Sequence, residues 1–133
     1  MKTILDKQQL HLTILRLAHQ LLENNLNLKE VVFIGIQPRG VQVGAKLMEN
    51  IAQLCPGEKI QYGILDITFY RDDVRNELHV ANTTDISFSI EGKKVVLIDD
   101  VLYTGRTIRA VLNELFDYGR PASVRLVVLV DRG

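Results

Sequence analysis

The chain has little of several residue types, and each scarcity excludes a class of protein. Its 133 residues contain a single cysteine, Cys55, so no disulfide bond can form within the chain. No apolar run approaches the ~18 residues of a membrane-spanning helix. The residues that follow Met1 also lack the apolar core of a signal peptide. We therefore expect a protein of the reducing cytoplasm that has no membrane partner.

Charge of one sign is not in excess either. The chain has 16 lysines and arginines against 16 aspartates and glutamates, so no overall field attracts nucleic acid. His11, His19, His79 and Cys55 are too widely spaced for a zinc site, which needs three or four close ligands. We therefore expect no metal that protein side chains hold directly.

What is present is an alternation of two hydrophobic patterns. Helical spacing predicts helices over residues 10–21, 43–54 and 108–116, and apolar runs predict strands over residues 31–36, 60–69, 95–98 and 124–130. The strands are rich in valine, isoleucine and leucine, as in sheets whose two faces are both covered. The chain length suits one domain. We predict a single α/β domain over residues 1–133, with a parallel sheet flanked by helices.

The most informative segment is a strand, a loop and the start of a helix. Its residues are Val95, Val96, Leu97, Ile98, Asp99, Asp100, Val101, Leu102, Tyr103, Thr104, Gly105, Arg106 and Thr107. Ligands of open α/β sheets bind at the carboxyl ends of strands, where the partial positive charge of the next helix suits a phosphate. Carboxylates repel phosphate but accept hydrogen bonds from ribose hydroxyls. The segment therefore predicts a site for a sugar and its phosphate.

This pattern has other interpretations. A strand that ends in two aspartates also occurs in P-loop ATPases, but their G-x-x-x-x-G-K-[ST] loop is absent here, as is the dinucleotide motif G-x-G-x-x-G. The two aspartates also have a purely structural interpretation. Asp100 would cap a helix, and Asp99 would be a surface charge.

Two further segments carry cations at predicted strand ends. Gln37, Pro38, Arg39 and Gly40 combine a positive side chain with a tight turn, which suits a pyrophosphate, although an ordinary turn has the same composition. Arg71 opens a polar segment over residues 71–87. A loop of this length in a compact domain is usually functional or disordered, so we expect either a lid over a phosphorylated ligand or a solvated loop.

Together these segments resemble the PyrR family of type I phosphoribosyltransferases. The resemblance is carried by residues 34–40, 65–73, 101–110 and 119–133, in the same order along the chain. That family comprises bifunctional pyrimidine-operon attenuation regulators and uracil phosphoribosyltransferases. The resemblance implies transfer of phosphoribosyl from 5-phosphoribosyl-1-pyrophosphate (PRPP) to uracil, which yields UMP and pyrophosphate.

The resemblance also implies roles for individual residues. Backbone amides over residues 103–107, with the hydroxyls of Thr104 and Thr107, would hold the 5′-phosphate. Residues 37–40 would line the pyrophosphate loop. The implied catalytic residues are Asp99 and Asp100 at the ribose, Arg39 at the pyrophosphate and Arg71 on the lid. Asp131 and Arg132 would lie on the side of the base.

The same resemblance implies partners for this chain, and the chain differs from the family in one respect. Mg²⁺ would arrive with PRPP, held by its phosphates, its hydroxyls and water rather than by the protein. Homodimers or larger assemblies are expected. Members of the family continue for a few tens of residues beyond Gly133 and form a hood over the base. We therefore expect a complete PRPP half of the site and weakened uracil turnover in this chain.

Two alternative functions remain open. The first is RNA-binding attenuation of pyrimidine biosynthesis genes in response to UMP and PRPP. The family associates its first helix with RNA contact, and Arg16 and His19 lie there, whereas strong phosphate binding needs clustered basic residues. The second is a nucleotide-binding module without turnover, which the missing hood favours.

Overall fold

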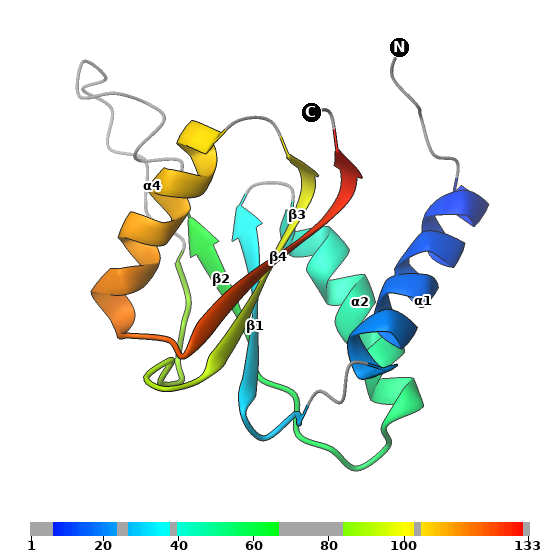
Figure 1. Ribbon diagram of the computed structural model, residues 1–133. Helices are drawn as coiled ribbons and strands as arrows, with labels where there is room; N and C mark the ends of the chain where they lie inside the picture. The colour runs from blue at the N-terminus through cyan, green and yellow to red at the C-terminus, as the bar shows by residue number, and fades with distance from the viewer. Residues whose placement is uncertain (1–6, 24–26, 38–39, 67–83, 103–104, 132–133) are drawn as a thin grey trace.

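The computed structural model describes residues 7–23, 27–37, 40–66, 84–102 and 105–131, which form helices and parallel strands. Figure 1 shows the helices on both sides of a central sheet. In chain order the elements are α1 (Lys7–Glu23), β1 (Val31–Gln37), α2 (Gly40–Leu54), β2 (Tyr62–Asp66), β3 (Lys94–Leu102), α4 (Gly105–Leu115), the 3₁₀ turn η1 (Phe116–Tyr118) and β4 (Ser123–Asp131).

The strand order creates a crevice between two strands that are not consecutive. The described strands form a four-stranded sheet in the order β2-β1-β3-β4, and every neighbouring pair is parallel. The chain moves outward from β1 to β2 and then returns to β3 on the other side of β1, where Gly35 pairs with Ile98. Adjacent strands whose connections diverge in this way form the usual ligand site of open α/β sheets.

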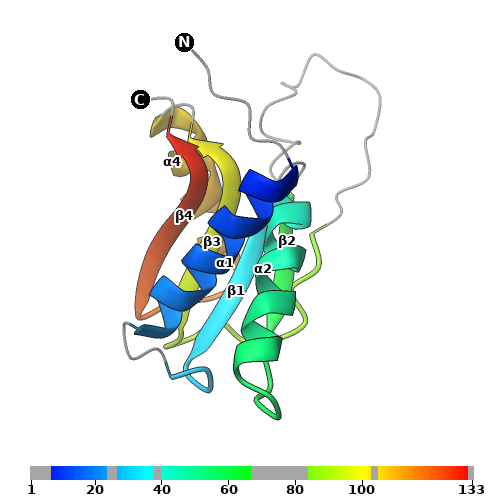
Figure 2. The same ribbon diagram turned by 90° about the vertical axis from the view of Figure 1, so that its right-hand side faces the viewer.

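Two hydrophobic cores lie on opposite faces of this sheet. Helices α1 and α2 cover one face and α4 covers the other (Figures 1 and 2). The first core includes Ile14, Phe33, Leu47, Ile51 and Ile98, and the second includes Ile34, Leu65, Leu97, Val111 and Leu115. Because alternate side chains point to opposite faces, β1 is buried over residues 31–36 without interruption. The predicted α/β fold is confirmed.

Of the strands, β3 and β2 differ most from their predicted bounds. β3 does not end at Ile98 but runs to Leu102, because β4 supplies partners along the added length: Asp99 pairs with Val128 and Val101 with Val130. Asp99 and Asp100 therefore belong to the strand itself. β2 begins at Tyr62 rather than at residue 60, and Ile60 packs against the first core from outside the strand. Residues 67–69 of that prediction lie outside the described residues.

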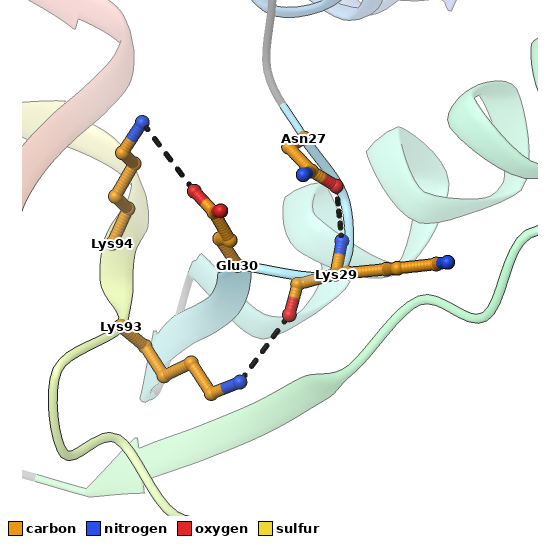
Figure 3. A network of polar contacts seen from close by, with 5 residues as sticks. All are labelled: Asn27, Lys29, Glu30, Lys93 and Lys94. Carbon is orange, nitrogen blue, oxygen red and sulfur yellow. Dashed lines mark hydrogen bonds and ion pairs between the residues drawn. The ribbon is translucent and has the colours of Figure 1, made fainter.

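The amino ends of β1 and β3 are joined by polar contacts at the edge opposite the crevice (Figure 3). The Lys94 N–H donates to the Glu30 carbonyl at 2.8 Å, and Lys94 Nζ lies 4.0 Å from Glu30 Oε1. Lys93 Nζ donates to the Lys29 carbonyl at 3.2 Å. Because these side chains are exposed, their ion pair adds little stability. The contacts fix the register of the two central strands.

None of the described helices is long and apolar enough to cross a membrane.

Phe33 and Phe116 provide a matched test of the core. Phe33 is 0% exposed in the first core, whereas Phe116 is 54% exposed on η1. We expect Phe33→Ala to lower the free energy of unfolding by about 3–5 kcal/mol, because it removes buried apolar surface and leaves a cavity. Phe116→Ala should change it by less than about 1 kcal/mol. Urea denaturation of both variants measures the difference, and equal losses would contradict this arrangement of the core.

Candidate functional site

Polar residues gather at the carboxyl edge of the sheet, at the top of Figure 1. Gln37 ends β1 and Asp66 ends β2, and the two are partners in the register. Helices α2 and α4 begin at the same edge, at Gly40 and Gly105, because each follows a parallel strand. Helix N-termini carry unpaired N–H groups and a partial positive charge. The edge therefore combines two anion-attracting helix ends with acidic strand ends.

The beginning of α2 lies directly against β3. Gly40 is buried, and a Cβ atom added to it would overlap the carbonyl oxygen of Ile98 and lie 2.9 Å from the Cα of Asp99. Such an approach is open only to glycine. The structure thus brings together the end of the predicted pyrophosphate loop and the first of the two adjacent aspartates, although 59 positions separate Gly40 from Asp99 in the numbering.

A tyrosine on β2 holds the first turn of α2 from the other side. The Tyr62 hydroxyl donates a hydrogen bond of 2.7 Å to the Val41 carbonyl. Burial raises the pKa of Tyr62 to about 12, so the hydroxyl keeps its proton at neutral pH. Gly35 and Gly44 leave room for it, since a Cβ atom at either position would overlap the hydroxyl oxygen. The sequence analysis missed Tyr62, because a sequence does not show which side chain fills the space that Gly35 and Gly44 leave.

Asp66 was also missed as a site residue. It is a charged residue that is only 5% exposed. Its N–H donates to Thr84 Oγ1 at 2.8 Å, and Asp85 exchanges backbone hydrogen bonds of 3.0 and 2.8 Å with Ile64. The segment 84–87, the end of the predicted lid, therefore begins beside β2. An acid directly after an apolar run, as Asp99 follows residues 95–98, was the available signal.

The remaining predicted site residues divide into three groups. Residues 95–98 are buried in the two cores, so they act by placing Asp99, which is half-buried. Along the backbone, residues 100–102 continue β3, residues 105–107 form the first turn of α4, and Asp131 ends β4. Pro38, Arg39, Arg71, Tyr103, Thr104 and Arg132 lie outside the described residues.

No group of three or more histidine, cysteine, aspartate or glutamate side chains in the described ranges could hold a metal ion. Cys55 is a free, half-buried thiol directly after α2.

Comparison with known proteins identifies the family. The whole chain, residues 1–133, matches the phosphoribosyl transferase domain family. It is 46% identical to the bifunctional protein PyrR of Caldicellulosiruptor bescii over 99% of this chain and 73% of that protein. It is 45% identical to the bifunctional protein PyrR of Pelotomaculum thermopropionicum, over 98% of this chain and 72% of that protein. The chain belongs to the PyrR family.

Solved structures place this PyrR family member in the type I phosphoribosyltransferase fold. A hypoxanthine-guanine phosphoribosyltransferase of Bacillus anthracis matches with a TM-score of 0.74 at 21% identity, over 100% of this chain and 75% of that one. A purine phosphoribosyltransferase of Pyrococcus horikoshii matches with a TM-score of 0.70 at 24% identity, over 96% of this chain and 76% of that one. At such identities the likeness concerns the fold alone.

Gly40→Ala tests the contact between α2 and β3. The added methyl group overlaps the Ile98 carbonyl and must displace the helix end from the strand. We expect a loss of about 1–3 kcal/mol in the free energy of unfolding together with weaker binding of Mg-PRPP. The control is Gly57→Ala, which strains a backbone with φ of 87° in open space beyond α2.

Calorimetric titration and denaturation should be run on both variants. The control should lose stability and keep its affinity for PRPP, because Gly57 follows the far end of α2. A Gly40→Ala protein that binds Mg-PRPP as tightly as the unaltered chain would show that this junction does not shape the site.

Proposed function

We propose that this PyrR family member is a uracil phosphoribosyltransferase that converts PRPP and uracil to UMP and pyrophosphate. The single observation that carries the proposal is the junction of Gly40 with Ile98 and Asp99. There a helix N-terminus, suited to an anion, lies beside an acidic residue of β3, suited to a sugar, at the point where the strand connections diverge.

PRPP carries phosphate at two separate positions, as a 5′-phosphate and as a pyrophosphate, and two helix N-termini are available at the edge. The 5′-phosphate fits the start of α4, where the amides of residues 103–107 would hold it with the hydroxyls of Thr104 and Thr107. The pyrophosphate fits the start of α2, with residues 37–40 around it and Arg39 as the positive side chain. Asp99 and Asp100 belong to β3, the strand that precedes α4, where they would accept hydrogen bonds from the ribose hydroxyls.

The proposed reaction needs charge stabilisation more than a covalent nucleophile. When the bond between ribose C1 and the pyrophosphate oxygen breaks, its electrons leave with pyrophosphate, and C1 and the ring oxygen become positive. Arg39 and the amides at the start of α2 would stabilise the departing negative charge. Asp99 and Asp100 would favour the developing positive charge. The uracil nitrogen then forms the new bond to C1, and its proton passes to water or to the released pyrophosphate. Holding that nitrogen close to C1 would supply the remaining acceleration.

Mg²⁺ fits this site as an ion that binds together with the substrate. The described residues offer no cluster of three protein ligands, and Mg²⁺ keeps several waters while it binds phosphate oxygens and one or two carboxylates. Asp99, half-buried at the edge, and Asp100 are the residues that would meet its waters or the ribose hydroxyls it touches. When bound, the ion neutralises charge on the leaving pyrophosphate.

Several parts of the proposed site stay predictions. Arg71 would lie on a lid whose described end, residues 84–87, begins beside β2. Asp131 and Arg132 would lie near the base, and Asp131 pairs with Leu102 at the carboxyl edge. A single domain over residues 1–133, a cytoplasmic location and a homodimer or larger assembly likewise remain predictions.

Asp99→Asn and Asp100→Asn test the sugar-binding role. Each change removes a charge while it keeps the shape of the side chain, so we expect kcat/KM for UMP formation to fall about 100-fold or more. Asp117→Asn on η1 is the control, because Asp117 is exposed in a different part of the fold. Assay of UMP and calorimetry with Mg-PRPP measure the effect. Unchanged affinity for PRPP in both aspartate variants would overturn the proposal.

RNA-dependent regulation is a second candidate function. Arg16 and His19 are exposed on α1, and the relatives are named bifunctional. A gel shift with pyrimidine-operon leader RNA at about 50 and 200 mM salt should show binding that weakens steeply with salt. Arg16→Ala should weaken it, whereas Arg109→Ala, at an exposed position on α4 across the sheet, should not. Equal binding by the two variants would exclude this role of α1.

A further inference from the structure

We propose that Tyr62 is a positioning residue for the pyrophosphate end of PRPP, acting through the first turn of α2. This inference rests on the proposed function and adds a residue that is not among those proposed to hold the ribose, its phosphates or the base. We use the term tyrosine clamp for Tyr62, the Val41 carbonyl that it binds, and the two glycines, Gly35 and Gly44, that make room for it.

The clamp joins three elements at one point. Tyr62 is the first residue of β2, Gly35 lies in β1, and Val41 and Gly44 lie in the first turns of α2. The hydroxyl reaches across β1 to the Val41 carbonyl at 2.7 Å, and Cβ atoms at Gly35 or Gly44 would occupy the place of its oxygen. An added Cβ at Gly44 would also lie 2.8 Å from the Tyr62 ring. Both positions therefore need glycine, because any larger residue would overlap Tyr62.

The first turn of α2 is held from two sides. Tyr62 binds Val41 from β2, and Gly40 abuts the Ile98 carbonyl and Asp99 from β3. Figure 2 shows α2 lying along the face of the sheet, with α1 beside it. With both contacts made, the amides at the start of α2 have one orientation relative to Asp99. With one contact removed, the helix end can shift toward or away from the sheet edge.

The hydroxyl is suited to a lasting structural bond. Its raised pKa, about 12 as a result of burial, keeps it a proton donor over the pH range of enzyme assays. The Val41 carbonyl is an acceptor within one turn of the residues proposed to hold pyrophosphate. Small displacements of groups that orient a substrate can greatly lower the affinity for that substrate and the rate of the reaction. Loss of the hydroxyl should therefore act on the pyrophosphate end and leave the 5′-phosphate end, on α4, unaffected.

Tyr62→Phe removes the hydroxyl and keeps the ring. We expect the KM for PRPP and the dissociation constant for Mg-pyrophosphate to rise about threefold to tenfold, as for the loss of one hydrogen bond. The KM for uracil and the dissociation constant for UMP, which carries only the 5′-phosphate, should stay within about twofold. The control is Tyr118→Phe, which removes a hydroxyl from an exposed tyrosine on η1.

A second variant separates positioning from simple packing. Tyr62→Val combined with Gly44→Ala replaces the clamp by apolar contact, since the smaller valine leaves space for the added methyl group. We expect this double variant to fold and still to bind Mg-pyrophosphate more weakly than the unaltered chain. Gly44→Ala alone should lower the Tm more than the double variant does, because its methyl group overlaps the Tyr62 hydroxyl.

The outcomes separate this inference from the proposed function. An unaltered chain that binds Mg-pyrophosphate but makes no UMP would refute the proposed function, and the titrations of the variants would still test the clamp. Wild-type affinity for Mg-pyrophosphate in Tyr62→Phe, equal weakening toward UMP and Mg-pyrophosphate, or no pyrophosphate binding by the unaltered chain would each overturn the inference. Selective weakening toward Mg-pyrophosphate in both variants would support it.

Discussion

The packing of α2 onto β3 is the constraint on which the rest of the proposed site depends. Gly40 allows the first residue of a helix to touch the Ile98 carbonyl and the Asp99 backbone. In the proposed site, this contact would set how far an anion at the helix N-terminus lies from a sugar at Asp99 and Asp100. A side chain of any size at this position would separate the two halves of the proposed PRPP site.

The sheet makes this junction possible because its two faces are buried by different helices. α1 and α2 cover one face and α4 the other, so the chain must leave β1 and β3 in opposite directions. The crevice between these neighbouring strands follows from that divergence. The apolar runs of β1 and β3 thus do more than stabilise the fold, because they determine where two helix N-termini can meet one ligand.

The predictable part of the fold was the part encoded by local pattern. Helical spacing predicted every described α-helix, and runs of branched apolar residues predicted every described strand. Both patterns are local, because the buried residues of each element recur at the spacing typical of a helix or a strand. The length of β3 was not predictable in this way. Asp99 and Asp100 look like the end of a strand, but partners on β4, such as Val128 for Asp99, extend the pairing beyond them.

The candidate site divides along the same line. The sequence by itself determined the α/β class and pointed to Asp99, Asp100 and residues 37–40 as candidate site residues, because these depend on residue type and short-range spacing. Only the tertiary structure decided that Gly40 touches Asp99, that Asp66 is buried, and that Tyr62 fills the space left by Gly35 and Gly44. Contacts between distant segments depend on strand order and helix placement, which no local pattern specifies.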